Sequence, residues 1–173
     1  MPFKYYGGVP PDYAKTASKT PVRTISPPPV VVLPMIQQIG APNKPVVKVG
    51  DTVKMGQLIG SNDAPVSAPV HSSVSGKVIA VEPRRHMLGD MVMSVVIEND
   101  FQDTPCEDMK PLSEEQLKDP DAIIARIREA GVVGMGGAMF PTAFKIQGAR
   151  GKVDTVIING AECEPYLCGD HRT

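Results

Sequence analysis

Short apolar runs rich in β-branched residues alternate with turn residues between positions 44 and 99. In order, the runs are PVVKV, TVKMGQLIG, APVSAPV, GKVIAVE and MSVVIEN. Short strands at regular spacing, separated by turn residues, are typical of a small all-β sandwich or barrel. The pattern therefore predicts an all-β domain over residues 43–100.

The pattern changes on both sides of this domain. Upstream, residues 1–42 hold closely spaced prolines. Proline excludes regular helix and favours extended backbone, so this stretch is expected to be an ordered, extended strap. Downstream, residues 101–118 are polar and acidic and are expected to form a linker that closes the β domain. A last segment, residues 119–173, remains.

The last segment opens with a helical pattern. Asp119 is a good N-cap, Pro120 suits the first helical position, and apolar residues recur at helical spacing over residues 123–130. Gly131 is expected to end this helix.

A glycine loop, GMGGAMF over residues 134–140, follows, and Pro141 could open a second short helix. After a turn at residues 148–152, the apolar run at residues 153–158 is too continuous for a half-exposed strand, which favours a buried parallel strand. The order helix, glycine loop, helix, strand is the start of an α/β unit. The whole chain is thus expected to be an α+β protein.

Composition narrows the class of function. The formal net charge is -1, and no basic cluster with interleaved aromatics is present, so no nucleic-acid partner is expected. The longest apolar run, residues 30–36, is too short to span a bilayer, and no signal peptide precedes it, so the cytoplasm is expected. A sparse, odd set of cysteines fits a reducing compartment: Cys106, Cys163 and Cys168.

The glycine loop admits two explanations. Gly134, Gly136 and Gly137 could serve only to join two helices, because glycine tolerates positive φ and close backbone approach. The loop fits neither the dinucleotide fingerprint nor the Gly-Lys-Ser/Thr phosphate loop. Alternatively, bare glycine amides, a helix start near Pro141 and the charge of Lys145 could together hold an anion such as phosphate.

A second candidate site follows the predicted strand, in NGAECEPY. In an open α/β sheet, ligands lie beyond the carboxyl ends of the strands. Asn159, Glu162 and Glu164 stand at that place, where the carboxylates could accept hydrogen bonds from ribose hydroxyls. The alternative is a solvated acidic loop without a ligand.

The stretch VKVGDTVKMGQLIG, followed by VSAPVHSSVSGKVIAVE, resembles the two halves of the biotinyl and lipoyl carrier fold. Carriers present a modified lysine at the hairpin tip between the halves. The tip is expected near residues 70–76, which offer His71 and no lysine before Lys77. We therefore expect the carrier fold in a structural role.

Together, GMGGAMFPTAFK and IINGAECEPY resemble the flavin and NADH site of the RnfC proteins of Rnf ion-translocating electron-transport complexes. The β-domain motifs stand in RnfC order as well, so the resemblance covers nearly the whole chain. The site motifs are also similar to those of the NADH-oxidising flavoprotein subunit of respiratory complex I. The resemblance implies a barrel-sandwich hybrid followed by the first part of an α/β Rossmann-like domain that binds FMN and NADH.

The resemblance also implies roles for single residues, with no catalytic acid or base and no metal ligand. The FMN contacts are Gly134, Gly137, Lys145 and Asn159. The NADH contacts are Gly136, Ala138, Phe140 and Glu164, and Glu162 lies close to the flavin. Hydride passes directly from nicotinamide to flavin, so the protein has to position the two cofactors.

By the same resemblance, the parent protein is an NADH:ferredoxin-type oxidoreductase subunit of a translocase. It would be peripheral on the cytoplasmic face of the membrane, bound to other subunits, and would pass electrons to two 4Fe-4S clusters. The cluster motifs are expected only beyond residue 173, because Cys163 and Cys168 form a C-x4-C pair and Cys106 is isolated. The chain is thus expected to be an N-terminal part without activity of its own.

Two departures keep alternatives open. Met139 stands where the family's GGAGF motif has a glycine. Ala161 stands where the complex I relatives have an aspartate, although RnfC proteins share the alanine. Met139 favours a docking subunit that keeps the fold without a flavin. A related cobalamin reductase of bacterial microcompartments shares the motifs and is a further alternative.

Overall fold

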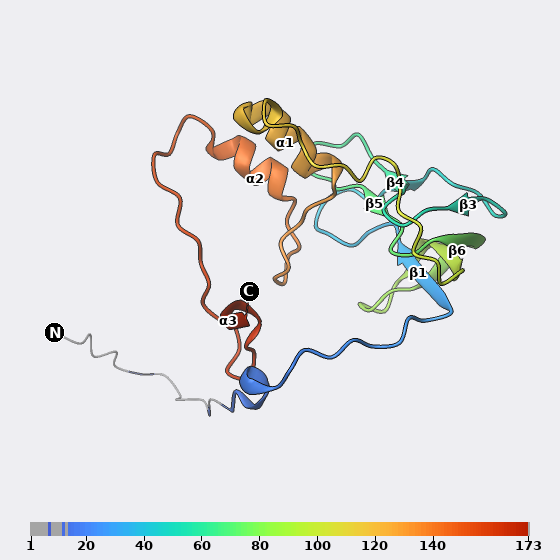
Figure 1. The fold of residues 1–173 in the computed structure, drawn as a ribbon, viewed down its shortest axis with the longest axis horizontal. Coiled ribbons are helices and arrows are strands. Elements are labelled where there is room, and N and C mark those ends of the chain that lie inside the picture. Colours follow the sequence, from blue (N-terminus) through green and yellow to red (C-terminus); the bar gives the residue numbers. More distant parts are fainter. Residues whose placement is uncertain (1–6, 8–11, 13, 173) are drawn as a thin grey trace. The chain divides into compact units, whose positions relative to one another are not determined.

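The structure is a computed structural model that describes residues 7, 12 and 14–172. Residues 1–6, 8–11 and 13 of the expected strap lie outside the described residues. The chain forms two compact units (Figure 1). The larger unit is Pro27–Lys152, and the smaller unit combines Met1–Ser26 with Val153–Thr173.

The larger unit contains two antiparallel sheets (Figure 1). The first sheet has the order β1-β7-β6-β3, formed by Val30–Pro34, Met91–Asn99, Gly76–Arg85 and Thr52–Val53. The second has the order β2-β4-β5, formed by Lys44–Pro45, Leu58–Ser61 and Val70–His71. The expected all-β fold is confirmed, and its sheet also takes in β1, at residues 30–34 of the expected strap, which pairs with β7.

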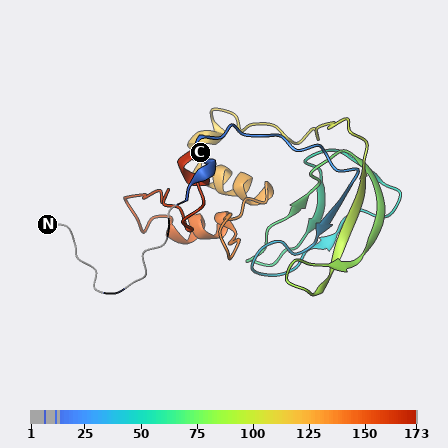
Figure 2. The same ribbon diagram turned by 90° about the horizontal axis from the view of Figure 1, so that it is seen from below.

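The two sheets lie face to face in the larger unit (Figure 2). Apolar side chains from both sheets form one core. Alternation along each strand sends every second side chain to the same face, and the buried set is aliphatic. The members of this core are Met35, Val53, Ile59, Val70, Val74, Val78, Val95 and Ile97. A register shift in the β6–β7 pairing between Val78 and Ala80 breaks the alternation, so that Val81 also packs against the core.

The turn between β4 and β5 corrects one expectation. We expected the tip between the carrier-like halves near residues 70–76, but Val70, Ser72, Val74 and Ser75 are buried. The connection between β4 and β5 is instead residues 62–69, and we call it the β4–β5 turn. The prediction failed because apolar and small residues occur on both sides of the true turn. The β4–β5 turn also contains no lysine.

The end of β7 is tied to the chain that follows it. The Ser75 hydroxyl donates to Asp100 Oδ1 over 2.6 Å and accepts from the Thr104 amide over 2.9 Å. The bond from Ser75, helped by the Gln102 amide, lowers the pKa of the Asp100 carboxyl. Further on, the Cys106 amide donates to the Met55 carbonyl over 2.8 Å, so residues 100–106 lie against the barrel.

The two helices of the larger unit agree with the sequence prediction. Helix α1 is Pro120–Glu129, preceded by the short 3-10 helix η2, Gln116–Lys118, and helix α2 is Thr142–Ala149. The Asp119 side chain caps α1 by accepting from the Asp121 amide over 2.9 Å. The helices pack side by side (Figure 1) and are linked by Arg128–Gln147 and Arg150–Asp121 contacts.

In the smaller unit, the expected buried strand at residues 153–158 is wrong for this structure. The run has no strand assignment, and Val156, Ile157 and Ile158 are 79%, 85% and 85% exposed. A strand requires hydrogen-bonding neighbours, and no segment among the described residues pairs with this run. The predicted α/β sheet therefore does not form among the described residues.

The smaller unit does contain the 3-10 helix η1, Thr16–Lys19, and the short helix α3, Gly169–Arg172. The Arg172 guanidinium donates to the carbonyls of Ala17, Ser18 and Thr20. Segments far apart in the sequence are thus joined at this place. No helix within the described part of the chain is long and apolar enough to cross a membrane.

Candidate functional site

The glycine loop is closed at its base by backbone hydrogen bonds. The Gly134 amide donates to the Phe140 carbonyl over 3.0 Å, and the Thr142 amide donates to the Val132 carbonyl over 3.0 Å. Between them, Val133 and Pro141 form an antiparallel bridge. The loop is therefore an ordered turn that leads from α1 into α2.

The three glycines of the loop are not explained by the needs of the chain itself. None of Gly134, Gly136 and Gly137 has a positive φ. A Cβ atom at Gly136 or Gly137 would meet no atom within 4 Å, and one at Gly134 would make only ordinary contacts with Phe140. The first explanation, that these glycines serve only to join two helices, therefore does not account for glycine at these positions.

The glycine backbone is free to receive a ligand. Among the hydrogen bonds of residues 14–172, none is donated by the amides of Gly136, Gly137 or Ala138. Helix α2 starts a few residues later without a side-chain cap, so after the Thr142 amide, which donates to the Val132 carbonyl, its next amides lack a side-chain acceptor. Exposed amides at the start of a helix are a general anion-binding arrangement.

Lys145 and Phe140 lie close to each other in the same region. Lys145 Nζ is 6.0 Å from the centroid of the Phe140 ring. The Phe140 and Phe144 rings meet edge to face, with centroids 5.9 Å apart. The structure thus places a cation beside an aromatic face at the end of the glycine loop, and the sequence had singled out both residues.

Met139 has a left-handed backbone conformation, with φ of 46°. Its amide donates to the Gly136 carbonyl over 3.1 Å and closes a tight turn. Left-handed backbone costs an L-residue about 1–2 kcal/mol, whereas glycine adopts it freely. The sequence identified position 139 as a departure from a glycine motif, and the backbone gives the physical reason for that motif.

The second candidate set, Asn159, Glu162 and Glu164, belongs to the smaller unit. Asn159 and Glu164 are exposed, and Glu162 is half-buried. Asn159 Oδ1 accepts from the Ala161 amide over 2.9 Å, which shapes the NGA turn. The glycine loop belongs to the larger unit, so the two candidate sets belong to different units.

A hollow of about 750 Å³ lies beside α1 in the larger unit. It was not foreseen from the sequence, because its lining comes from four separated segments. His71 contributes to the lining, and burial lowers the pKa of its imidazole below the ordinary value. The charged residues that line the hollow are of both signs: Asp108, Lys110, Arg126, Arg128 and Glu129.

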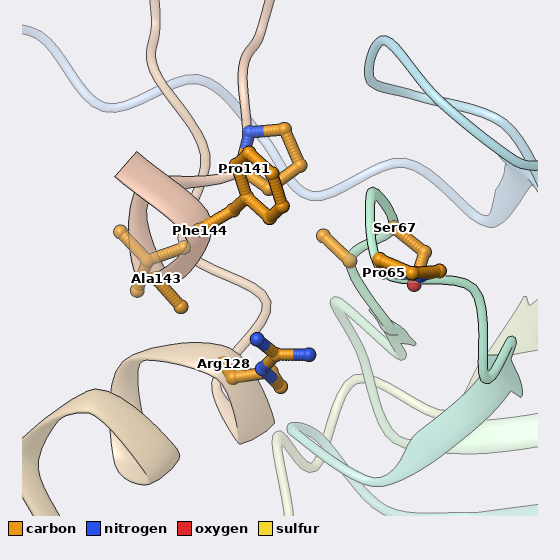
Figure 3. A pocket seen from close by; sticks show the side chains of 8 residues that line it. Pro65, Ser67, Arg128, Pro141, Ala143 and Phe144 are labelled. Carbon is orange, nitrogen blue, oxygen red and sulfur yellow. The ribbon is translucent and has the colours of Figure 1, made fainter. Parts of the chain in front are cut away.

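A narrow seam lies where the β4–β5 turn meets the helices (Figure 3). Pro65 and Ser67 of the turn lie across from residues of α1 and α2 and the chain between them. The buried side chains of Ala68 and Ala143 also line the seam. The barrel and the helices that carry the glycine loop are thus in direct contact.

A small barrel-sandwich hybrid followed by a helix, an open glycine loop and a second helix defines a β module joined to the start of a cofactor-binding domain. Residues 3–102 match the RnfC barrel sandwich hybrid domain. Residues 127–173 match the Nuo51 FMN-binding domain. The chain belongs to the RnfC family.

Curated relatives agree with this assignment, and each is the RnfC-type component of its complex. The chain is 50% identical, over 96% of its length, to that component of the Na(+)-translocating ferredoxin:NAD(+) oxidoreductase complex of Acetobacterium woodii. It is 44% identical, over 98% of its length, to the proton-translocating counterpart of Clostridium ljungdahlii. It is 42% identical, over 98% of its length, to the counterpart in an ion-translocating oxidoreductase complex of Rhodobacter capsulatus. The chain spans 38%, 37% and 33% of these relatives, respectively.

Proposed function

We propose that this protein binds FMN at the glycine loop and serves as the NADH-oxidising subunit of an Rnf-type electron-transport complex. One observation carries the proposal. Gly136 and Gly137 are glycines that neither backbone conformation nor crowding requires, and their amides are open. Because no protein atom fills the space over these glycines, a ligand can occupy it. The match to an FMN-binding domain indicates that this ligand is FMN.

The residues present fit the phosphate of FMN. The Gly137 amide, the first turn of α2 and the Lys145 ammonium would face the phosphate. Gly134 would also contact FMN, whereas Gly136 and Ala138 would contact NADH. FMN supplies the redox chemistry, since it accepts hydride and releases single electrons. The protein binds the phosphate and orients the ring, and Phe140 offers an apolar face for the nicotinamide ring of NADH.

The remaining contacts are proposed by family resemblance. Asn159 would bind the flavin, Glu164 the NADH ribose, and Glu162 would lie near the flavin, in a Rossmann-like domain that begins at residue 119. The proposed division before it is a strap over residues 1–42, of which β1 joins the barrel sheet, the β domain over residues 43–100 and a linker over residues 101–118. The match of residues 127–173 to an FMN-binding domain supports the start of such a domain.

The rest of the electron path is proposed from the relatives. Their names describe subunits of ion-translocating complexes that link ferredoxin and NAD(+). Electrons from FMN would pass to 4Fe-4S clusters outside this chain and then to other subunits, with ion translocation as the result. The protein would lie at the cytoplasmic face of the membrane.

A flavin titration of the whole gene product tests the proposal. FMN and riboflavin differ in the phosphate, so FMN should bind at least about tenfold more tightly if amides and Lys145 hold that group. Flavin fluorescence quenching measures both affinities. Lys145→Ala should reduce the preference for FMN, and Lys152→Ala, which removes an exposed lysine bonded to the Gly148 carbonyl, should not. Equal affinities for the two flavins would refute the phosphate site.

A second function has one structural observation in its favour. The left-handed φ of Met139 strains the loop at its tip, as expected in a docking subunit that has lost its flavin. In that case the protein purifies without a yellow chromophore and does not take up FMN on titration. A flavin that copurifies with the protein excludes this alternative.

Replacing Met139 with glycine should raise FMN affinity by up to about tenfold. The substitution removes a penalty of about 1–2 kcal/mol for left-handed backbone, partly offset by about 0.5–1 kcal/mol of glycine entropy in the unfolded chain. If the strain keeps the binding-competent loop partly unpopulated, its removal lowers the apparent Kd. Met135→Gly is the control, because Met135 is 92% exposed and lacks a positive φ. An equal gain in both variants would contradict the strain at position 139.

A further inference from the structure

The tip of the glycine loop is held by a segment far away in the sequence. The Ile39 amide donates to the Ala138 carbonyl over 3.2 Å. Ala138 lies between the open Gly137 and the left-handed Met139. A bond at this residue therefore fixes the backbone at the point where the loop presents its free amides.

Ile39 belongs to a turn of the barrel, residues 36–41, which we call the anchor turn. It is itself held against the β4–β5 turn, since the Ala41 amide donates to the Val66 carbonyl over 3.0 Å. The buried Gln38 side chain donates to the Ala68 carbonyl over 3.4 Å. Gly40 has φ of 120°, and a Cβ atom there would lie 2.2 Å from the Val66 carbonyl oxygen. Only glycine allows this approach.

The same β4–β5 turn also lies against the base of the glycine loop. Gly131, which ends α1, has φ of 67°, and a Cβ atom there would lie 2.5 Å from the Pro69 carbonyl oxygen. The seam in Figure 3 continues this contact to α2. Both ends of the loop are therefore positioned by the β4–β5 turn of the barrel. The base contacts this turn directly, and the tip contacts it through the anchor turn.

We infer that the anchor turn is a positioning element of the flavin site, and that Ile39 and Gly40 set the conformation of the glycine loop without touching the cofactor. Preorganised amides bind an anion better than amides that must be ordered on binding. The barrel, which carries no cofactor lysine on its β4–β5 turn, thus acts as the support for the neighbouring loop. The consequence for flavin rests on the proposed function, whereas the effect on the loop does not.

Gly40→Ala tests the inference in the whole gene product, with amide hydrogen exchange as the main readout. The added methyl group should push the anchor turn away from Val66 and break the Ile39–Ala138 bond. Exchange at the Gly134 and Met139 amides should then be roughly tenfold faster, because the loop opens locally. FMN affinity, measured on the same sample, should fall by roughly the same factor.

Gly50→Ala is the matched control. Gly50 also has a left-handed backbone, with φ of 96°, but a Cβ atom there would meet nothing within 4 Å. Gly50→Ala introduces the same backbone strain but does not displace the anchor turn. Hydrogen exchange in the glycine loop should therefore stay at the wild-type rate. If Gly40→Ala and Gly50→Ala change loop exchange equally, the inference is overturned.

Ile39→Pro provides a second test in case Gly40→Ala does not fold. Proline removes the donor of the bond to Ala138, and Ile39 is 51% exposed, so little core packing is lost. Loop exchange should again be faster than in the wild type, and wild-type exchange would overturn the inference. The readouts separate the two proposals: a protein that never binds FMN contradicts the proposed function, while loop exchange alone decides the role of the anchor turn.

Discussion

Replacing Gly137 with tryptophan is expected to abolish FMN binding and leave the fold unchanged. A Cβ atom at Gly137 would meet no protein atom within 4 Å, so the indole extends into the space over the loop that we assign to the phosphate. Losing charge-assisted hydrogen bonds worth about 1.5–3 kcal/mol each should weaken binding by roughly 100-fold or more. Fluorescence titration measures the affinity, and thermal unfolding checks the fold.

The matched control is Gly148→Trp. Gly148 is an exposed residue of α2, and a Cβ atom there also meets no atom within 4 Å. It adds the same bulk in helix α2, outside the glycine loop. FMN affinity should remain at the wild-type value in this variant. Tight FMN binding by Gly137→Trp would place the phosphate somewhere other than the loop.

Replacing Gly76 with alanine should destabilise the barrel by at least about 3 kcal/mol. Gly76 begins β6 between β3 and β7, and a Cβ atom would lie 1.9 Å from the Glu98 carbonyl oxygen. The obstacle is backbone of the neighbouring strand, so the overlap can be relieved only by moving strands that enclose the core. Urea unfolding followed by circular dichroism measures the loss, a large share of the roughly 5–15 kcal/mol typical of a domain.

Gly89→Ala separates crowding from backbone conformation in this experiment. Gly89 lies in the turn between β6 and β7 with φ of 100°, and a Cβ atom there would meet nothing within 4 Å. Its cost should be limited to the left-handed penalty of about 1–2 kcal/mol. Equal losses in the two variants would mean that the approach of Gly76 to Glu98 does not limit stability.

Local signals in the sequence predicted the parts of the fold that local physics decides. Helix α1 followed from its cap and its first proline, and the strands of the barrel followed from the spacing of β-branched runs. The pairing of β1 with β7 could not be predicted, because a single sequence does not show which distant strand becomes a neighbour. For the same reason, the sequence placed the tip of the carrier-like fold near residues 70–76 and not at the β4–β5 turn.

The candidate site was predictable to a similar degree. The sequence identified the glycines, Lys145 and Phe140, which lie together in one loop and helix start. It also marked Met139 as unusual, although only the left-handed φ explains why glycine belongs there. Ile39 carried no signal, since its contribution is a backbone amide whose partner, Ala138, is far away in the sequence. The buried strand at residues 153–158 failed because burial depends on neighbours that a local apolar run cannot specify.

That exposed run has a consequence for handling the isolated chain. Residues 153–158 read VDTVII, which combines high β propensity with one charge and no proline. Segments of this composition, exposed and without a partner strand, pair with copies of themselves and start aggregation. Intermolecular β assembly therefore competes with the native state whenever this stretch is left uncovered, and a charged substitution at Ile157 is the simplest way to suppress it.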